Sequence, residues 1–207
     1  MKKVILSTFA VFTFYFSSAQ SVRFGVKGGV NVGNIISAND RADSKVGYHI
    51  GSFSEVRVSE RFSIQPEILY SRQGATAEET ATISGVLYSG KVDLKLSYIY
   101  VPVLVKYYVV KDFSLEAGPQ IGFLTSAKAD AEISAVGGGP AIKQSRDLKE
   151  KFNTVDFGFN FGLGYKFVKN FSATVRYNHS LLDLNKESAS TKAVKNAVVQ
   201  VSIGYTF

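Results

Sequence analysis

The chain contains no cysteine and no tryptophan, and it has only one methionine and four prolines among its 207 residues. Without cysteine it can form no disulfide and can use no thiol chemistry. Beyond the start of the chain, no apolar run reaches the roughly 18 residues of a membrane-spanning helix. Convincing helical periodicity is also absent. The chain is instead rich in aromatic residues and glycine, with 16 Phe, 11 Tyr and 18 Gly, which predicts many strands and few helices.

The first stretch, MKKVILSTFAVFTFYFSSAQ, has the pattern of a secretory signal peptide. Two lysines precede the apolar run Val4–Phe16, and the small residues Ser17 and Ala19 occupy the positions expected before a cleavage site. The apolar run is about 13 residues long, which is shorter than the roughly 20 that a membrane anchor needs. We therefore predict that residues 1–19 are a signal peptide and that residues 20–207 form one domain.

Charge gives little indication of a partner. Removal of the leader leaves 22 Lys and Arg against 17 Asp and Glu, so the formal net charge falls from +7 to +5. The excess is spread along the chain without a basic run, which argues against a nucleic-acid partner. No spacing typical of metal ligands is present, and we expect no cofactor.

Eight stretches alternate between apolar and polar residues. In FNTVDFGFNFGLGYKF, the odd positions from Val155 to Phe167 are apolar and the even positions are polar or glycine. Successive side chains on a strand point to opposite faces, so each stretch predicts a strand with one apolar face. The eight stretches are residues 22–32, 46–58, 62–71, 97–109, 113–123, 152–167, 171–181 and 196–207. In the second, Phe53 breaks the alternation.

The connections between these strands alternate in length. Residues 59–61, 110–112 and 168–170 form tight turns, and the longer connections span about 33–45, 74–91, 128–151 and 183–196. This layout predicts an all-β fold: an eight-stranded antiparallel up-and-down transmembrane β-barrel with short periplasmic turns and long extracellular loops. The segment 74–91 alternates well enough to extend the third and fourth strands, and 146–152 could form a short helical turn.

The alternation alone does not say which face points inward. A soluble barrel of the lipocalin type would enclose its apolar face. Here the polar face is rich in Gly, Ser, Asn, Gln and Thr, which suits the crowded interior of a narrow barrel. The apolar face carries aromatic residues near the strand ends, as an interfacial girdle does. We therefore predict that the apolar face contacts lipid.

The inward face then carries ten charged residues. These are Arg23, Lys27, Glu55, Arg57, Glu67, Lys106, Glu116, Asp156, Lys166 and Arg176. Ions in a narrow lumen cost several kcal/mol each unless they are paired. We expect a cross-linked network that plugs the lumen. The alternative is a small-solute, porin-like pore with a weak preference for anions, since cations outnumber carboxylates at these positions.

Several segments resemble the small outer-membrane β-barrel family known as the porin family or PorT-like proteins. The matching segments are FGVKGGVNVGNI (24–35), FSIQPEILYSRQG (62–74) and YIYVPVLVKYYV (98–109). The resemblance implies an exported protein in the outer membrane of a Gram-negative cell, and it says little about activity. One branch of the family is linked to protein secretion, which is a further alternative here. Members usually carry an acidic residue where this chain has Tyr100, so charge pairing at that height is in question.

The other expectations concern the ends of the barrel. Phe207 at the end of the last strand resembles the signal that the barrel-assembly machinery reads, and the lipid bilayer is the second expected partner. The long loops could bind an extracellular ligand or envelope protein, with a structural or surface-interaction role. His179 and Asp183 share a face near the outer rim and are the least favoured alternative, a rim hydrolase. His49 is similarly isolated from any carboxylate, and we expect no enzyme activity.

Overall fold

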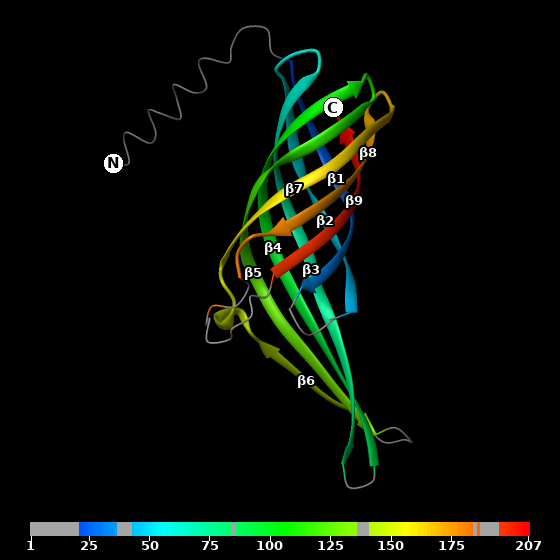
Figure 1. Cartoon of the computed structure of the whole chain (residues 1–207), viewed down its shortest axis with the longest axis vertical. Helices are drawn as coiled ribbons and strands as arrows, with labels where there is room; N and C mark the ends of the chain where they lie inside the picture. Colours follow the sequence, from blue (N-terminus) through cyan, green and yellow to red (C-terminus); the bar gives the residue numbers. More distant parts are fainter. Residues whose placement is uncertain (1–20, 37–42, 84–85, 136–140, 184–185, 187–194) are drawn as a thin grey trace, which may run out of the picture.

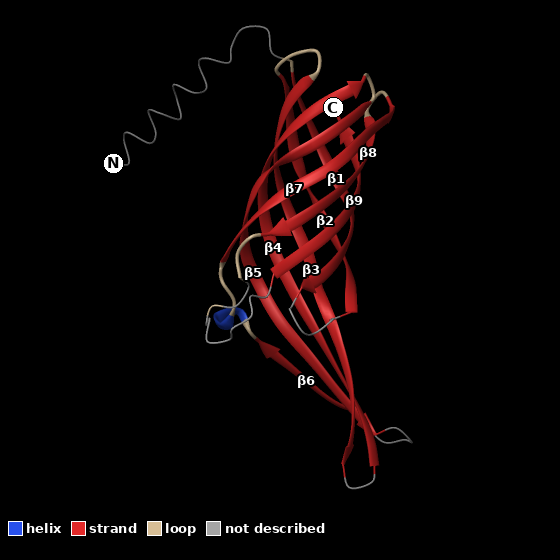
Figure 2. Ribbon diagram, viewed as in Figure 1, coloured by secondary structure: helices blue, strands red, loops and turns tan. Residues whose placement is uncertain are grey.

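The computed structural model describes residues 21–36, 43–83, 86–135, 141–183, 186 and 195–207, and the predicted leader lies outside them. Nearly all of this part of the chain is strand (Figure 2). The elements are β1 (Val22–Ile36), β2 (Asp43–Arg57), β3 (Phe62–Ile83), β4 (Val86–Val110), β5 (Phe113–Ala135), β6 (Ile142–Asp147), the 3₁₀ turn η1 (Lys149–Lys151), β7 (Val155–Val168), β8 (Phe171–Ser180) and β9 (Lys195–Thr206). No helix in the described part is long and apolar enough to cross a membrane.

Eight of the strands close into an antiparallel ring, as predicted (Figure 1). The order of neighbours is β4, β3, β2, β1, β9, β8, β7 and β5, and the pairing of β4 with β5 closes the ring. The first and last strands meet along their lengths, with Val30 opposite Val201. Closure leaves no free sheet edge around the ring, so its backbone groups are paired between strands.

The two ends of the ring differ. β2 and β3, β4 and β5, and β7 and β8 are joined at one end by residues 58–61, 111–112 and 169–170, close to the predicted turns. The C-terminus lies at this same end in Figure 1. We call it the turn end, and the opposite one the loop end.

Three strands continue far past the loop end. β3, β4 and β5 are 22, 25 and 23 residues long, and β6 pairs with the outer part of β5 from Lys128 to Ile133. We call residues 76–83, 86–95 and 128–135 together with β6 the extension; it projects at the bottom of Figure 1. The predicted lengthening of the third and fourth strands is confirmed. The prediction of 128–151 as a loop is wrong, because strand β5 continues and β6 follows.

The apolar face of the ring points outward, as predicted. Ile50, Phe161 and Ile203 are exposed, whereas their polar neighbours His49, Asn160 and Ser202 are buried in the lumen. This distribution is the reverse of that in a soluble barrel, and it suits a protein surrounded by lipid. Phe53 breaks the alternation of apolar and polar residues because it points into the lumen, where its ring packs over Gly25 and Gly204. A Cβ on Gly25 would lie 2.3 Å from Phe53 Cζ, so that position requires glycine.

Candidate functional site

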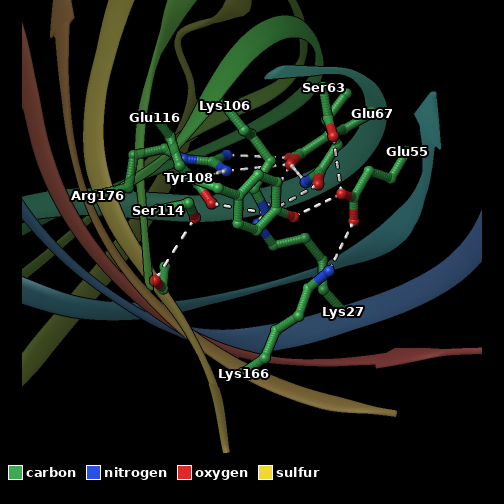
Figure 3. A network of polar contacts seen from close by, with 12 residues as sticks. Lys27, Glu55, Ser63, Glu67, Lys106, Tyr108, Ser114, Glu116, Lys166 and Arg176 are labelled. Atoms are coloured by element: carbon green, nitrogen blue, oxygen red, sulfur yellow. Dashed lines mark hydrogen bonds and ion pairs between the residues drawn. The ribbon is translucent and has the colours of Figure 1, made fainter. Parts of the chain in front are cut away.

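The lumen holds a cluster of buried ions in the half nearest the turn end. Arg176 on β8 donates from Nη1 to Glu67 Oε2 and from Nη2 to Glu67 Oε1, each at 3.0 Å. The same Nη2 donates to Glu116 Oε2 on β5 at 2.8 Å. Arg176 is only 2% exposed, so these two carboxylates take the place of water around its charge. Figure 3 shows the guanidinium facing the two carboxylates.

Two lysines and a glutamine extend this arrangement. Lys27 Nζ on β1 lies 3.4 Å from Glu67 Oε1, and Lys106 Nζ on β4 lies 3.1 Å from Glu116 Oε1. Gln65 connects the two halves, because its Nε2 donates to Glu67 at 2.7 Å and its Oε1 accepts from Lys106 at 3.1 Å. Polar contacts therefore tie β1, β3, β4, β5 and β8 together across the lumen.

A second group lies one step closer to the turn end. Glu55 on β2 accepts hydrogen bonds from Tyr108 and, at 3.0 Å, from Ser63. Lys166 Nζ on β7 lies 3.4 Å from Glu55 Oε2 and 5.0 Å from the centre of the Tyr108 ring. The guanidinium of Arg57 lies over the same ring at 4.4 Å, within cation–π distance. Lys106 Nζ lies 5.9 Å from the centre of the same ring, so Tyr108 lies near three cations as well as the carboxylate of Glu55. Figure 3 shows Tyr108 with Lys106, Lys166 and Glu55.

The structure brings seven of the ten predicted lumen ions together. The seven are Lys27, Glu55, Glu67, Lys106, Glu116, Lys166 and Arg176. We call them the lumen cluster. Arg23 is exposed at the turn end, and Arg57 donates to the backbone carbonyls of Ser59 and Glu60 in the adjacent turn. Asp156 lies near the loop end, away from the cluster.

The lumen cluster contains four cations and three carboxylates, so its formal surplus is one positive charge. This is less than the surplus of two expected from all ten positions. A cavity of about 10 Å³ adjoins Lys27, Lys106 and Lys166. That volume is room for about one water molecule and not for a solute.

A hydrogen-bonded chain around His49 fills the middle of the lumen. His49 Nδ1 lies 2.7 Å from Asn31 Oδ1, and His49 Nε2 lies 2.7 Å from Ser202 Oγ. Asn31 Nδ2 donates to Ser71 Oγ at 2.9 Å, so its Oδ1 is the acceptor for His49 Nδ1. Ser202 then donates to Nε2 of a neutral imidazole. The sequence shows His49 without a carboxylate, and its partners instead are an amide and a hydroxyl from other strands.

The order hydroxyl, imidazole, amide is one that nucleophilic enzymes use, but its surroundings here oppose catalysis. Asn31, His49 and Ser202 are all buried, and a reacting carbonyl would have to approach within about 3 Å of the Ser202 oxygen. The packed lumen offers no space for that approach in the part of the chain described. We regard the hydrogen bonds between Asn31, His49 and Ser202 as a structural link between β1, β2 and β9.

The loop-end half of the lumen contains a packed group of apolar and aromatic side chains. Leu69 on β3, Leu96 and Tyr98 on β4 and Leu124 on β5 are nearly inaccessible, and Phe152 packs against them from the segment after η1. The Tyr98 and Tyr100 rings stack at 5.1 Å. We call the group Leu69, Leu96, Tyr98, Tyr100, Leu124, Ala127 and Phe152 the aromatic plug. The alternation of residues 97–109 puts Tyr98 and Tyr100 on the inward face, opposite Ile99 and Val101. The alternating segments do not by themselves identify Leu69, Leu124 and Phe152 as lumen residues.

Tyr100 stands where related proteins usually carry an acidic residue, and its contacts show how charge is paired at this depth of the lumen. Its hydroxyl donates to Asp156 Oδ2 at 3.1 Å, and Gln73 Nε2 donates to the same hydroxyl at 3.0 Å. Asp156 also accepts from Ser180 Oγ. The carboxylate at this height therefore comes from β7, and hydroxyl groups stabilise it where the lumen cluster would use a cation.

The predicted rim pair makes separate contacts. His179 stacks on Tyr177 with ring centroids 6.2 Å apart, on the outward face of β8. The backbone carbonyl of Asp183 accepts from Asn153 Nδ2 at 2.9 Å. No group of three or more His, Cys, Asp or Glu suited to a metal ion occurs among the described residues.

The extension carries a second set of ion pairs, on its outer face. Glu78 on β3, Lys91 on β4, Glu132 on β5 and Lys143 on β6 lie directly opposite one another across the four strands. Lys91 Nζ lies 2.9 Å from Glu78, and Lys143 Nζ lies 3.4 Å from Glu132. We call these four residues the charge row. Strand alternation from Ile99 through Lys95 to Lys91 makes this face continuous with the outward wall of the ring.

A neighbouring pair links the extension to β2. Lys45 Nζ lies 2.8 Å from Asp93 Oδ1, and Thr76 donates to the same oxygen at 2.6 Å. These bonds, from Lys45 first and Thr76 second, hold the pKa of the Asp93 carboxyl below its ordinary value. A hydrogen bond from Lys95 likewise lowers the pKa of Asp130, and one to Glu78 raises the pKa of Lys91. Each shift favours the charged form of an exposed or half-exposed group.

Comparison with known proteins agrees with this architecture. The family model described as "Outer membrane protein beta-barrel domain" matches residues 18–186, which is most of the chain. The chain belongs to this family. It is therefore an outer-membrane β-barrel protein of the Gram-negative type, embedded in the bilayer. None of the curated proteins searched matches the chain.

Solved structures show the same fold at low identity. Ail, the attachment invasion locus protein of Yersinia pestis, in complex with the heparin analogue sucrose octasulfate, is 15% identical over 90% of this chain and 99% of its own, with a TM-score of 0.50. Neisserial surface protein A is 14% identical over 90% of this chain and 99% of its own, also with a TM-score of 0.50. At these identities the likeness shows the fold alone.

Proposed function

We propose that this protein is a sealed outer-membrane barrel whose working part is the extension, which presents a binding surface outside the cell. The filled lumen supports the first part of the proposal. The lumen cluster occupies the periplasmic half and the aromatic plug the extracellular half, so a solute would have to displace both. The lumen cluster is held by ion pairs and the aromatic plug by apolar packing. A substitution that disrupts one of them is therefore expected to leave the other packed.

The strands themselves support the second part. Three of the eight ring strands continue as strands to form the extension, with a β-bulge at Thr125 of β5, and β6 adds a fourth strand. A lone surface loop needs no such continuous hydrogen bonding. The charge row is balanced, with two acids and two bases. Although Ail has been crystallised with a heparin analogue, this balance does not favour a polyanionic ligand for the present chain.

Single-channel recording in planar bilayers tests the seal. We expect no steady conductance from the purified protein, because both layers of the lumen are packed. A double variant, Glu67→Ala with Leu69→Ala, removes one central residue from each layer and is expected to give detectable current. Ile68→Ala, on the neighbouring lipid-facing position, is the control and is expected to stay closed. A stable open current from the unmodified protein would favour the porin-like alternative and overturn the seal.

Export and assembly complete the proposal. Residues 1–19 act as a cleaved signal peptide, and Phe207 is read by the barrel-assembly machinery. The Phe207 amide donates to the Phe24 carbonyl at 2.9 Å, which places it at the seam where the ring closes. Replacing Phe207 with Ser tests the signal role. We expect less folded protein in outer-membrane fractions with unchanged stability of the protein that does assemble. Equal yields of both forms would remove Phe207 from this role.

A further inference from the structure

Among the described residues, no strand pairs with the outer edge of β6, which is the last strand of the extension. Beside β6, the Leu148 amide donates to the Ala127 carbonyl at 2.9 Å, in register with the β5–β6 pairs. In an antiparallel ladder, bonded and non-bonded pairs alternate along the strand. Arg146, Gln144 and Ile142 therefore use their backbone groups toward β5. The backbone N–H and C=O groups of Lys143 and Ser145 point away from β5, toward the open edge.

The side chains at this edge define what a further strand would meet. Lys143 ends the charge row on one face and is 71% exposed at its side chain. Ile142 lies on the other face, directly opposite Ile133 on β5, and is 70% exposed. Because the charge row alternates in sign from Glu78 to Lys143, the next residue in that row would be acidic. A residue added beside Ile142 would meet the apolar pair Ile142 and Ile133, which an aliphatic side chain suits.

We propose that the β6 edge binds an extended polypeptide segment in which acidic residues alternate with aliphatic ones. This rests on the proposed function, which makes the extension a binding surface, and it names the partner's chemistry. Main-chain hydrogen bonds to Lys143 and Ser145 give affinity, and side chains on alternate faces give selectivity. The acids of the segment meet Lys143, and its aliphatic side chains cover Ile142 and Ile133.

The surroundings of β6 strengthen the preference for an acidic segment. Arg146 on β6 and Lys149 and Lys151 in η1 outnumber Asp147 and Glu150, so the stretch as a whole is positively charged. Arg146 lies on the face of Ile142, and Asp147 lies on the face of Lys143. The opposite edge of the extension differs, because there the charge row ends on Glu78. The two edges should therefore choose partners of opposite charge, and β6 is the one that selects acids.

The test uses the full protein in lipid nanodiscs and two labelled synthetic peptides of equal length. One alternates Glu with Val, and the other alternates Lys with Val. Fluorescence anisotropy should show the Glu peptide binding at least tenfold more tightly than the Lys peptide at low salt. Added salt should narrow the difference, because the pairs at the edge are exposed to solvent.

Two variants locate the contact. Ser145→Pro removes an N–H that faces the open edge and leaves the bonds to β5 in place, so binding of the Glu peptide should fall at least tenfold. Ser145→Ala is the matched control and should bind as the unmodified protein does. Lys143→Glu should reverse the preference between the two peptides.

Three outcomes would overturn the inference. They are equal binding of both peptides, unchanged binding by Ser145→Pro, and an unchanged preference in Lys143→Glu. Far-ultraviolet circular dichroism of each variant shows whether it has folded, and Ser145→Asn offers a second control that keeps the N–H. Bilayer conductance does not depend on the peptide, so failure of the seal and failure of this partner assignment can be told apart.

Discussion

The lumen cluster and the charge row use the same residue types in different surroundings. Arg176, Glu67 and Glu116 are cut off from water, and each polar group depends on its neighbours. Lys91 and Glu78 lie in solvent, where water competes with each contact and salt screens it. The comparison teaches that an ion pair's contribution is set by what replaces it when it breaks. In the lumen no water is available to replace a broken ion pair, whereas on the extension water takes its place.

The largest predicted effect follows from removing a carboxylate from the buried lumen cluster. Glu67→Ala leaves Arg176 with only Glu116 and leaves Lys27 without its carboxylate. We expect a loss of about 4 kcal/mol in the free energy of unfolding, because an uncompensated charge remains buried. Urea unfolding in lipid vesicles, followed by circular dichroism, measures it. Glu67→Gln is the control for shape, and a loss below 1 kcal/mol, roughly the surface-pair value, would remove the distinction.

A smaller loss is expected in the aromatic plug. Leu69 is 1% exposed in the lumen, and Leu69→Ala should cost about 3 kcal/mol through the cavity that it leaves. Ile68 is its neighbour on the lipid face and is 59% exposed. Ile68→Ala should cost less, since acyl chains can fill the vacated space. Equal losses in the same unfolding measurement would mean that the lumen relaxes as freely as lipid does.

On the exposed side, Asp93→Asn should cost less than about 1 kcal/mol at neutral pH. The substitution keeps a hydrogen-bond acceptor for Lys45 and Thr76 and removes only the charge. The same urea titration checks it, and added salt should shrink the difference further. A loss as large as that of Glu67→Ala would show that the extension is as poorly hydrated as the lumen.

The smallest predicted effect is a dependence on pH confined to the extension. The pKa of Asp93 is below its ordinary value of 3.8 in the folded protein. Its contribution is therefore complete above that value and is lost as the pH falls through the lower folded value. Pepsin cleavage between β3 and β4 should accelerate over that acidic range. Asp93→Asn should flatten this dependence, and an unchanged profile in that variant would assign it to other groups.

Alternation in the sequence predicts the ring well, because a period of two residues fixes which side chains share a face. Phe161 and Ile203 lie outward and Lys27 and Arg176 inward as expected. The outer part of β5 escapes prediction because its inner face is largely alanine, including Ala129 and Ala131, while its outer face mixes charges as a loop would. β6 is exposed at every residue and so carries no burial signal.

Parity predicts which way a lumen residue points but not its depth. Glu67 and Asp156 both face inward, yet one meets Arg176 and the other meets Tyr100 and Ser180. Depth depends on how far each strand is shifted against its neighbours around the ring, which no single strand encodes. The partners of His49 come from β1 and β9 for the same reason.

β5 changes its partner along its length, from β7 between Phe113 and Phe123 to β6 from Lys128 onward. β5 remains one strand through this change, with a β-bulge at Thr125, and β3 and β4 run beside it over the same distance. A pull applied to the extension would thus travel along three continuous strands into the ring, past the β-bulge at Thr125. A partner bound to the extension would therefore be mechanically coupled to the barrel in the membrane.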